Sequence, residues 1–450
     1  GSGEEIVAIE SDRQMIPASN MKVLTSGAAL HALGPNFRFN TKLMLDGDRL
    51  VVIGDGDPAF GDPDLLKLMS VDGSDGLDVD GFLNLWIQAM EDTGIESISE
   101  VIVDDRIFDR RFVHETWPIE QLNSRSFAEV AGLTFHLNVL RFYPKPVPGQ
   151  RPDITDFHPK THWLIPANSA TCREGAHEEN SGWIARKHNT NELTFYGNIK
   201  TSKRPVMVPV TIHNVPEFFA QLLAERLRRA GLTVGGYRVV EPTEGEFAGR
   251  LLEPVITTPL STAITRCNRD SKNIYAECLI KRIGHARTGQ PGSWTNGTAI
   301  VRLVIHERLA NRILSSNVVI ADASGLSREN RIAPGTMTGW LNSFHTDETL
   351  GPVFIDSLAH AGVSGTLAKR FKDIDLHGAS VQAKTGFING VSCLSGYVTM
   401  PDGRRRCFSV MVNDIPAHRY VYTAKRLQEK IVAAIVDDMA VTEVQALGGE

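Results

Sequence analysis

The chain has 450 residues, of which 42% are hydrophobic and 22% charged, as is usual for a globular protein of about three domains. Because 47 Lys and Arg stand against 53 Asp and Glu, the net charge is −6, and no run rich in Lys or Arg indicates nucleic-acid binding. No run of about 18 or more apolar residues occurs, so no transmembrane segment is predicted.

The start of the chain, GSGEEIVAIES, lacks the basic and apolar regions of a signal peptide. A leading GSG is typical of a cloning remnant, so we expect the native N-terminus to lie upstream. The five cysteines show no CxxC pair and no metal-ligand spacing, and they fix neither a compartment nor a disulfide pairing. His158 and His162 lie four residues apart, but no Glu or Cys accompanies them, and we predict no metal site and no cofactor.

Residues 4–10 predict a strand that leads into a helix beginning near Ser19 and ended by the pair at 34–35, Gly-Pro. Further along, the loop GDGDPAFGDPDLL has the aspartates of a calcium loop, but Leu66 stands at the twelfth position, where an acidic ligand is needed. We therefore interpret its aspartates as residues that stabilise turns. The other elements predicted in this part of the chain are strands at 37–44, 50–53 and 101–104 and a helix at 80–93.

The composition shifts between Pro144 and Pro209, where a Pro-rich turn and short polar segments predict a small β-rich insertion. After it we predict a strand at 206–212, an amphipathic helix at 216–230, a strand at 236–240 and an extended segment at 251–267. The last part of the chain is predicted to form one body of helices and strands. Its elements are helices at 272–283, 298–312 and 419–437 and strands at 317–322, 380–384, 391–400 and 405–414.

Ser19 and Lys22 lie three residues apart at the start of the first predicted helix. With about 3.6 residues per turn, this spacing places the hydroxyl and the amine side by side. A serine hydroxyl is a poor nucleophile until a base takes its proton, and a neutral lysine can do so. The helix N-terminus presents N–H groups where negative charge builds during acyl transfer. Taken alone, however, this pair is more often part of a capped surface helix.

Two further triplets favour a catalytic role for Ser19 and Lys22 over a capped surface helix. SKN at 271–273 lies at a predicted loop-to-helix junction, and KTG at 384–386 ends a predicted strand. The near miss at 160–162 is Lys-Thr-His, and a competing Ser-x-Asn at 315–317 runs directly into a predicted buried strand, so we prefer Ser271 and Asn273. Each triplet alone would be a strand end or a helix cap, but the order SxxK, SxN, KTG is specific.

The chemistry of acyl transfer explains why the first two motifs are needed together. We expect Ser19 to attack a carbonyl carbon while Lys22 takes the serine proton. Ser271 can carry a proton to the leaving amine, and Asn273 can orient Lys22 and the substrate amide. A second cation, Lys384, disfavours the charged form of Lys22, which suits a base that works near neutral pH.

The third motif suits recognition of the substrate. Lys384 supplies positive potential for a substrate carboxylate, and Thr385 supplies a hydroxyl to bond it. Gly386 lets the backbone pass close to the substrate, whose own backbone can pair with this strand. The N–H groups of Ser19 and Phe387 are expected to form the oxyanion hole.

A gap of 252 residues separates Ser19 from Ser271, and 113 residues separate Ser271 from Lys384. The first gap is far longer than in a compact serine β-lactamase and leaves room for inserted domains. The segments PASNMK, GDGDPAF, VIVDDRIF, SKN, ASGLSREN and KTGFINGVSCLSGYV together resemble the class C low-molecular-mass penicillin-binding proteins. These are serine D-alanyl-D-alanine carboxypeptidases and endopeptidases, and the likeness covers nearly the whole chain.

The resemblance implies an α+β fold. A β-lactamase/transpeptidase-like domain, an antiparallel sheet flanked by helices, would carry two nested inserted domains. It implies a catalytic domain at 1–35 and 256–450, a second domain at 36–141 and 206–255, and a small β-rich third domain at 142–205. The family's first strand upstream of EEIVAIES is absent here, and the middle residue of SKN is a charged Lys272.

The resemblance also implies roles outside the three motifs. Asp104 matches an acidic residue that reaches toward the amino end of a diaminopimelate side chain, and Arg328 and Asn389 match positions that line the same pocket. The alternative for Asp104 is a turn carboxylate at a strand end.

We therefore expect a periplasmic or secreted enzyme that acts through an acyl-enzyme on Ser19. It would hydrolyse peptidoglycan stem peptides, be acylated by β-lactams and need no metal or cofactor. One alternative is a β-lactamase or esterase on the same fold, although no extra Glu motif is placed to activate a water. Another is a peptidoglycan-binding scaffold with a relic site, but a relic has no reason to keep all five catalytic residues. The oligomeric state is left open.

Overall fold

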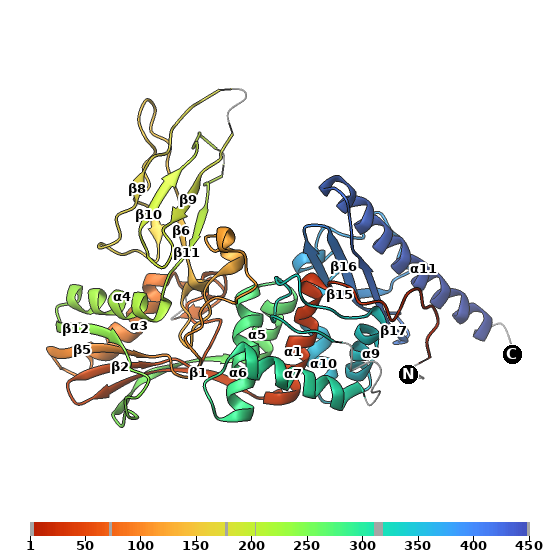
Figure 1. Cartoon of the computed structure of the whole chain (residues 1–450), viewed down its shortest axis with the longest axis horizontal. Helices are drawn as coiled ribbons and strands as arrows, with labels where there is room; N and C mark the ends of the chain where they lie inside the picture. Colours follow the sequence, from red (N-terminus) through yellow and green to blue (C-terminus); the bar gives the residue numbers. More distant parts are fainter. Residues whose placement is uncertain (1–3, 72–73, 176–178, 203, 310–317, 448–450) are drawn as a thin grey trace. The chain divides into compact units, whose positions relative to one another are not determined.

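The computed structural model describes residues 4–71, 74–175, 179–202, 204–309 and 318–447. The chain folds as two compact units (Figure 1). One contains Gly1–Phe37 and Pro259–Glu450, and the other contains Arg38–Thr258. The fold is a mixed α+β fold in which an antiparallel sheet is flanked by helices, as the sequence predicts.

The first unit contains a four-stranded antiparallel sheet in the order β14-β15-β16-β17. The strands are β14 (Ala359–His360), β15 (Ser380–Ile388), β16 (Val391–Thr399) and β17 (Arg405–Val412). Strand β16 is buried at every residue except Thr399, because successive side chains point to opposite faces and both faces are covered.

The two faces of β16 have different neighbours. Leu394 and Val398 belong to an apolar cluster that includes Val432 and Val436 of the C-terminal helix α11 (Val421–Leu447). On the opposite face, Tyr397 donates a hydrogen bond of 2.7 Å from its hydroxyl to the carbonyl of Leu341. The sheet therefore lies between α11 and the remaining helices of the unit.

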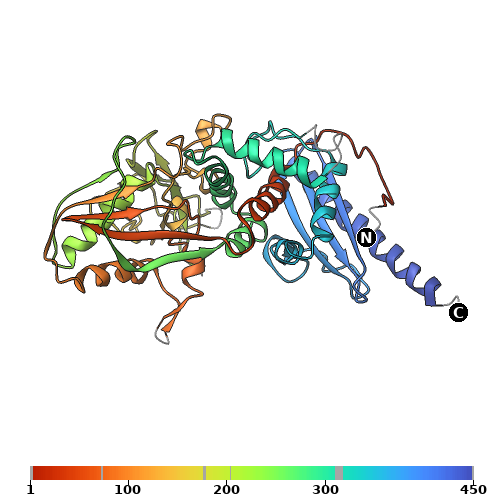
Figure 2. The same cartoon turned by 90° about the horizontal axis from the view of Figure 1, so that it is seen from below.

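Helix α1 (Met21–Leu33) is buried over its first ten residues, because other helices and the sheet surround it. Its Gly27 faces the rings of Trp340 and Phe344 so closely that a Cβ there would come within 2.8 Å of both. Gly34, at φ 85°, ends the helix. In Figure 2, α1 (red) lies beside the blue strands of the sheet. The other helices of the unit are α5 (Leu260–Asn268), α6 (Asn273–Thr288), α7 (Trp294–Leu309), α9 (Pro334–His345) and α10 (Gly351–Asp356), with 3₁₀ turns η1 (Ala18–Asn20), η5 (Gly365–Leu367) and η6 (His418–Tyr420).

The second unit contains a five-stranded sheet in the order β12-β5-β2-β1-β13. Strand β2 runs parallel to β5 and antiparallel to β1, and β5 runs parallel to β12. Helices α3 and α4 contribute to a buried aromatic cluster at its core, in which Phe60, Trp86 and Phe219 are in ring contact. The elements are β1 (Arg38–Asp46), β2 (Arg49–Ile53), β5 (Ser97–Asp104), β12 (Thr233–Val239), β13 (Arg250–Pro259), α3 (Val79–Glu91) and α4 (Val215–Arg229).

Smaller sheets complete this unit. Strands β11-β6-β7 form one, β8-β10-β9 a second and β3-β4 a third. Residues 142–205, predicted as a separate third domain, lie within the same compact unit, and that domain boundary stays a prediction. The elements are β3 (Ser70–Val71), β4 (Ser74–Asp75), β6 (Val139–Phe142), β7 (Phe157–His158), β8 (Ala167–Asn168), β9 (Trp183–Arg186), β10 (Leu193–Tyr196), β11 (Val208–Thr211), α2 (Pro63–Leu66), η2 (Ile119–Gln121), η3 (Arg125–Phe127) and η4 (His136–Asn138).

Several predicted elements are wrong. Residues 4–10 form no strand and are exposed, since no neighbouring strand pairs with them among the described residues. The extended segment predicted to run to 267 ends at Pro259, and the apolar face of the following residues forms helix α5 instead. The predicted strand at 317–322 is reduced to an isolated bridge between Val319 and Arg331. The competing Ser-x-Asn at 315–317 lies outside the described residues.

Aspartates of the loop GDGDPAFGDPDLL accept hydrogen bonds that stabilise turns and the start of a helix. Asp57 accepts hydrogen bonds from the Ala59 N–H (2.8 Å) and from the Thr258 hydroxyl (2.6 Å). Asp62 caps α2 by accepting from the Asp64 N–H at 2.9 Å. Among the described residues, no cluster of His, Cys, Asp and Glu could hold a metal ion.

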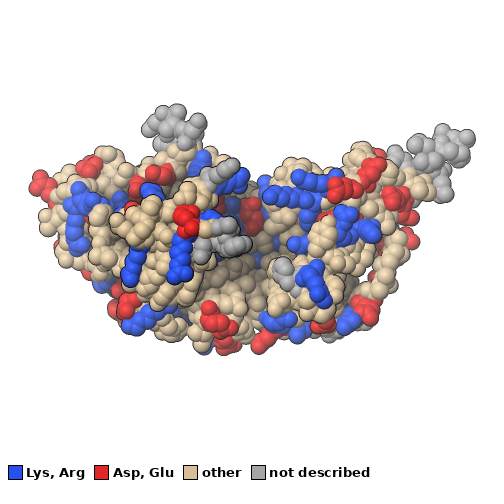
Figure 3. All heavy atoms as spheres, turned by 90° about the horizontal axis from the view of Figure 1, so that it is seen from above, with Lys and Arg blue, Asp and Glu red and all other residues tan. Residues whose placement is uncertain are grey.

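Within the described ranges, no helix is long and apolar enough to cross a bilayer. No disulfide joins any of the five cysteines, all of which are among the residues that the structure describes. Basic and acidic side chains are interspersed over the face drawn in Figure 3, in keeping with the modest net charge.

Candidate active site

Ser19 lies in the 3₁₀ turn η1, directly before α1, rather than in the first turn of the helix itself. The turn is closed by a hydrogen bond of 3.1 Å from the Asn20 N–H to the Pro17 carbonyl. Ala18, just before the serine, has φ 46°, a backbone conformation that L-residues rarely adopt. Ala18 and Asn20, the two neighbours of Ser19, are buried, while Ser19 itself is half-buried. The turn therefore presents the serine side chain from an otherwise buried segment.

Lys22 lies one helical turn further and is fully buried. Its Nζ is 3.1 Å from Ser19 Oγ, 2.7 Å from Asn273 Oδ1 and 2.8 Å from the Ser324 carbonyl oxygen. These three acceptors match the three hydrogens of an ammonium group. Burial lowers the pKa of Lys22 from 10.5 to about 8, because the charged form is poorly solvated there. A neutral amine is thus accessible at near-neutral pH.

Lys384 and Ser271 form a second hydrogen-bonded pair. Lys384 Nζ donates to Ser271 Oγ at 2.8 Å and to the Thr385 carbonyl at 2.7 Å. Ser271 has φ 57°, so its backbone, like that of Ala18, is strained beside the cluster. Burial, and then the charge of Lys22, lower the pKa of Lys384 well below its usual value. A positive charge on Lys22 therefore disfavours the ammonium form of Lys384.

The KTG triplet lies within β15, which continues to Ile388, so it does not end the strand as predicted. Gly386 is needed by the protein's own fold: a Cβ there would come within 2.6 Å of the Pro17 carbonyl oxygen. Strand β14 pairs with β15 only at Gln382 and Ala383. Among the described strands, none pairs with that edge of β15 beyond Ala383, which is where a substrate backbone could add.

Three further predicted residues lie in the same unit. Arg328 donates from Nη1 to the backbone carbonyl of Asn389 at 2.8 Å, so these two residues do meet. Phe387 follows Gly386 on β15 and is 43% exposed, and its ring has Lys425 Nζ 5.7 Å from its centroid. Hydrogen bonds therefore join Ser19, Lys22 and Asn273 in one group and Ser271 and Lys384 in another, and Ser271 and Asn273 are two residues apart in the chain. The other predicted residues of this unit lie on or against β15 and the turn that follows it: Thr385, Gly386, Phe387, Asn389 and Arg328.

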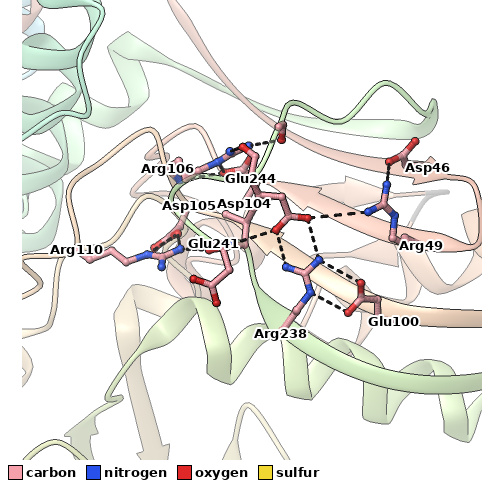
Figure 4. Close-up of polar contacts among 12 residues, drawn as sticks. Asp46, Arg49, Glu100, Asp104, Asp105, Arg106, Arg110, Arg238, Glu241 and Glu244 are labelled. Atoms are coloured by element: carbon pink, nitrogen blue, oxygen red, sulfur yellow. Dashed lines mark hydrogen bonds and ion pairs between the residues drawn. The ribbon is translucent and has the colours of Figure 1, made fainter.

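Asp104 belongs to the second unit, where it is the last residue of β5. Its carboxylate binds Arg106 through two side-chain hydrogen bonds of 2.9 and 2.7 Å, and also accepts the Arg106 N–H at 3.1 Å. Arg106 in turn reaches the backbone carbonyls of Glu244 and Gly245 (Figure 4). These contacts match the turn-carboxylate alternative, and recognition of a substrate amine by Asp104 stays a prediction.

Sequence reasoning missed Glu277, which lies one turn after Asn273 on α6 and is fully buried. Its carboxylate accepts hydrogen bonds from Trp294 Nε1 at 2.7 Å, the Ala323 N–H at 3.2 Å and the Ser324 N–H at 2.9 Å. Burial, and then the charge of Asp322, raise the pKa of Glu277 to about 7. Glu277 thereby holds Ser324, the residue whose carbonyl accepts from Lys22. The detectable signal was its position four residues after Asn273, on the same helix face.

Asp322 fixes the other half of the ASGLSREN loop. It accepts hydrogen bonds from the N–H groups of Gly325 (2.9 Å) and Ser327 (2.7 Å) and from the Asn330 side chain (2.7 Å). Gly325 lies so close to Ala18 that a Cβ would come within 1.8 Å of the Ala18 carbonyl oxygen. The loop therefore packs directly against the turn that carries Ser19.

Comparison with known proteins finds relatives that match most of the chain. The chain is 28% identical to a D-alanyl-D-alanine carboxypeptidase from Actinomadura sp. (strain R39), over 92% of this chain and 76% of that protein. In fold it is similar to penicillin-binding protein 4 (dacB) from Haemophilus influenzae, with a TM-score of 0.74, 22% identity, and coverage of 95% of this chain and 93% of that chain. A structure of that protein complexed with a β-lactam gives a TM-score of 0.68 at 21% identity, with the same coverage.

The sequence profile of the D-Ala-D-Ala carboxypeptidase 3 (S13) family matches residues 1–433, nearly the whole chain. The match includes all three motifs and both parts of the unit that carries them. This protein belongs to the D-Ala-D-Ala carboxypeptidase 3 (S13) family.

Proposed function

We propose that this protein is a serine D-alanyl-D-alanine carboxypeptidase that also cleaves peptidoglycan cross-links as an endopeptidase. The observation that carries the proposal is the position of Lys22 Nζ, 3.1 Å from Ser19 Oγ, in a site that lowers the pKa of Lys22 to about 8. Membership of the S13 family supports the choice of substrate.

Acylation begins when Ser19 Oγ attacks the carbonyl carbon of the penultimate D-alanine and its proton passes to neutral Lys22. The carbonyl oxygen becomes an oxyanion, for which the N–H groups of Ser19 and Phe387 are the proposed donors. The carbon–nitrogen bond then breaks. Ser271 gives its hydroxyl proton to the leaving amine and is reprotonated by Lys384, 2.8 Å away. Lys22 then loses to solvent the proton it took from Ser19, and Lys384 takes one up from solvent, so both regain their starting forms. Water attacks the acyl-enzyme with neutral Lys22 as the base, and the proton returns to Ser19 Oγ as the ester bond breaks and the shortened peptide is released.

Binding of the substrate carboxylate should change the protonation of Lys384. In the free protein, burial and Lys22 lower the pKa of Lys384. An arriving carboxylate opposes that shift, because a nearby opposite charge favours the ammonium form. A charged Lys384 then disfavours charge on Lys22, which favours the neutral base. Binding of a free carboxylate thus prepares Lys22 to accept the serine proton.

Peptidoglycan stem peptides are the proposed substrates, and β-lactams, which imitate their acyl-D-alanyl-D-alanine end, are the proposed acylating inhibitors. Such substrates lie outside the cytoplasmic membrane, so the proposed location is the periplasm or the cell exterior. Arg328 and Asn389 are proposed to bind the distal part of the stem peptide, and Asp104 of the second unit is proposed to bind its side-chain amine. No step of this chemistry requires a metal or a cofactor.

Release of D-alanine from an acyl-D-alanyl-D-alanine peptide tests the proposal. Wild-type protein should release D-alanine, and Ser19→Ala should not. A β-lactamase would instead turn over a chromogenic cephalosporin rapidly, and a scaffold would do neither. Absence of D-alanine release from correctly folded wild-type protein would contradict the proposal.

A further inference from the structure

A second threonine hydroxyl lies beside the KTG triplet. Thr366, in the 3₁₀ turn η5, accepts a hydrogen bond of 2.9 Å from the Thr385 hydroxyl. Thr366 is exposed and Thr385 is half-buried, so solvent reaches the pair. The sequence motifs assign a role to Thr385 and none to Thr366, which lies 19 residues earlier in the chain.

Backbone contacts hold the Thr366 turn in place. The Thr366 N–H donates to the Arg269 carbonyl at 3.1 Å. Gly365, at φ 56°, lies so close to Arg269 that a Cβ would come within 2.2 Å of the same carbonyl oxygen. Arg269 precedes Ser271 by two residues. The Thr366 hydroxyl is therefore fixed between the loop that carries Ser271 and the strand that carries Thr385.

The count of hydrogens shows what this pair can bind. Each hydroxyl has one hydrogen to donate. Because Thr385 gives its hydrogen to Thr366, the hydrogen of Thr366 is not used in that bond and can be offered to an incoming acceptor. Lys384 Nζ lies 2.7 Å from the Thr385 carbonyl oxygen and 2.8 Å from Ser271 Oγ, so it brings positive potential to the backbone of Thr385. The remaining hydroxyl hydrogen, with a cation nearby, suits a carboxylate, which only accepts hydrogen bonds when ionised.

We propose that Thr366 is a substrate-binding residue whose hydroxyl, paired with that of Thr385, binds the free C-terminal carboxylate of the peptide. This inference rests on the proposed carboxypeptidase function. In the resulting chain each hydroxyl polarises the next, which strengthens the bond to the carboxylate. The pair would therefore help the site to distinguish a free carboxylate from a blocked end.

The test compares two thioester substrates with the same acyl-D-alanyl group and the same scissile bond. One has mercaptoacetate as its leaving group and keeps a free carboxylate, and the other has the methyl ester of mercaptoacetate. Release of the thiol is measured for wild type, Thr366→Val, which keeps the shape without the hydroxyl, and Thr366→Ser, which restores the hydroxyl. Thr346→Val, a second exposed threonine of the same unit, is the matched control, and thermal unfolding verifies that each variant folds.

We expect Thr366→Val to lower kcat/KM for the free-carboxylate substrate by about 10- to 100-fold, the usual effect of one hydrogen bond to a charged group. The methyl ester should change by less than about twofold, Thr366→Ser should recover most of the loss, and Thr346→Val should match wild type. An unchanged ratio between the two substrates in Thr366→Val would overturn this inference alone. If wild type cleaved neither substrate and formed no adduct with penicillin, both this inference and the proposed function would be overturned.

Discussion

Asn273 Oδ1 accepts a hydrogen bond of 2.7 Å from Lys22 Nζ, which links the first residue of α6 to the proposed base on α1. The two residues are 251 positions apart in the sequence. The same ammonium group lies 3.1 Å from Ser19, so Asn273 orients the amine toward the nucleophile. This arrangement and the buried groups around it determine how acylation should respond to substitution and to pH.

Replacing Lys22 with Arg tests whether the residue acts as a base. An arginine keeps the positive charge but stays protonated, so Lys22→Arg should lower the rate of acylation by about 10²- to 10⁴-fold. The rate is measured with a labelled penicillin under single-turnover conditions. Lys272→Arg, in the middle of SKN, serves as the control and should acylate almost normally. Near-normal acylation of Lys22→Arg would mean that Lys22 supplies only charge.

The pH dependence of acylation should report the same group. Because the pKa of Lys22 is lowered to about 8, the fraction of Lys22 in the neutral form increases as the pH rises through that value. The second-order rate constant for acylation should therefore rise about tenfold per pH unit at low pH and level off above about pH 8. A plateau that already begins near pH 6, or a rise that continues to pH 10, would assign the base to a different group or environment.

Replacing Glu277 should change both the pH profile of acylation and the free energy of unfolding. Its negative charge raises the pKa of Lys22, so Glu277→Gln should move the midpoint of the acylation profile to lower pH. It should also lower the free energy of unfolding by about 1–3 kcal/mol, because the amide cannot accept all three hydrogen bonds. Trp294→Phe removes one of these donors and leaves the charge, so it should lose stability without moving the midpoint. A midpoint that moves equally in both variants would show that only packing is involved.

Asp104→Asn tests the family-based role of that carboxylate. If Asp104 faces the ammonium of the stem peptide, the variant should lower kcat/KM by about 5- to 150-fold, or ~1–3 kcal/mol, on peptides with a free side-chain amine. Penicillin acylation and peptides with a blocked amine should be nearly unchanged. Arg106→Ala is the comparison, because it removes the partner seen in the structure. Equal losses on all three substrates in Asp104→Asn would leave Asp104 as a turn residue that positions Arg106.

The catalytic cluster could be predicted from sequence because its chemistry requires particular residue types at short spacings. Ser19 and Lys22 are one turn apart, and Ser271 and Asn273 flank the start of a helix, so local geometry determines much of their arrangement. What joined the motifs across the chain was their order and the resemblance to a family. Helices α3, α4 and α6 and strands β15, β16 and β17 were found because their periodicity and turn residues agree with their final environment.

The failures have physical causes too. Residues 4–10 have β-branched side chains, but a strand needs a partner, and the described residues provide none for this segment. Residues 260–268 follow Pro259 and contain three Thr or Ser, a composition that favours extended structure, yet Leu260, Ile264 and Cys267 are buried on one helical face. Glu277 and Thr366 escaped notice because their partners are backbone groups or residues of distant segments, which one sequence cannot reveal.

The proposed mechanism requires Ser19 to be the nucleophile, and mass mapping of a β-lactam adduct identifies the acylated residue. Wild-type protein incubated with penicillin should gain the mass of one intact penicillin, and peptide mapping should place it on Ser19. Ser19→Ala should gain nothing while unfolding at the wild-type temperature, and Ser99→Ala, an exposed serine of the second unit, should label like wild type. An adduct on any other serine, or labelling that persists in Ser19→Ala, would contradict the account.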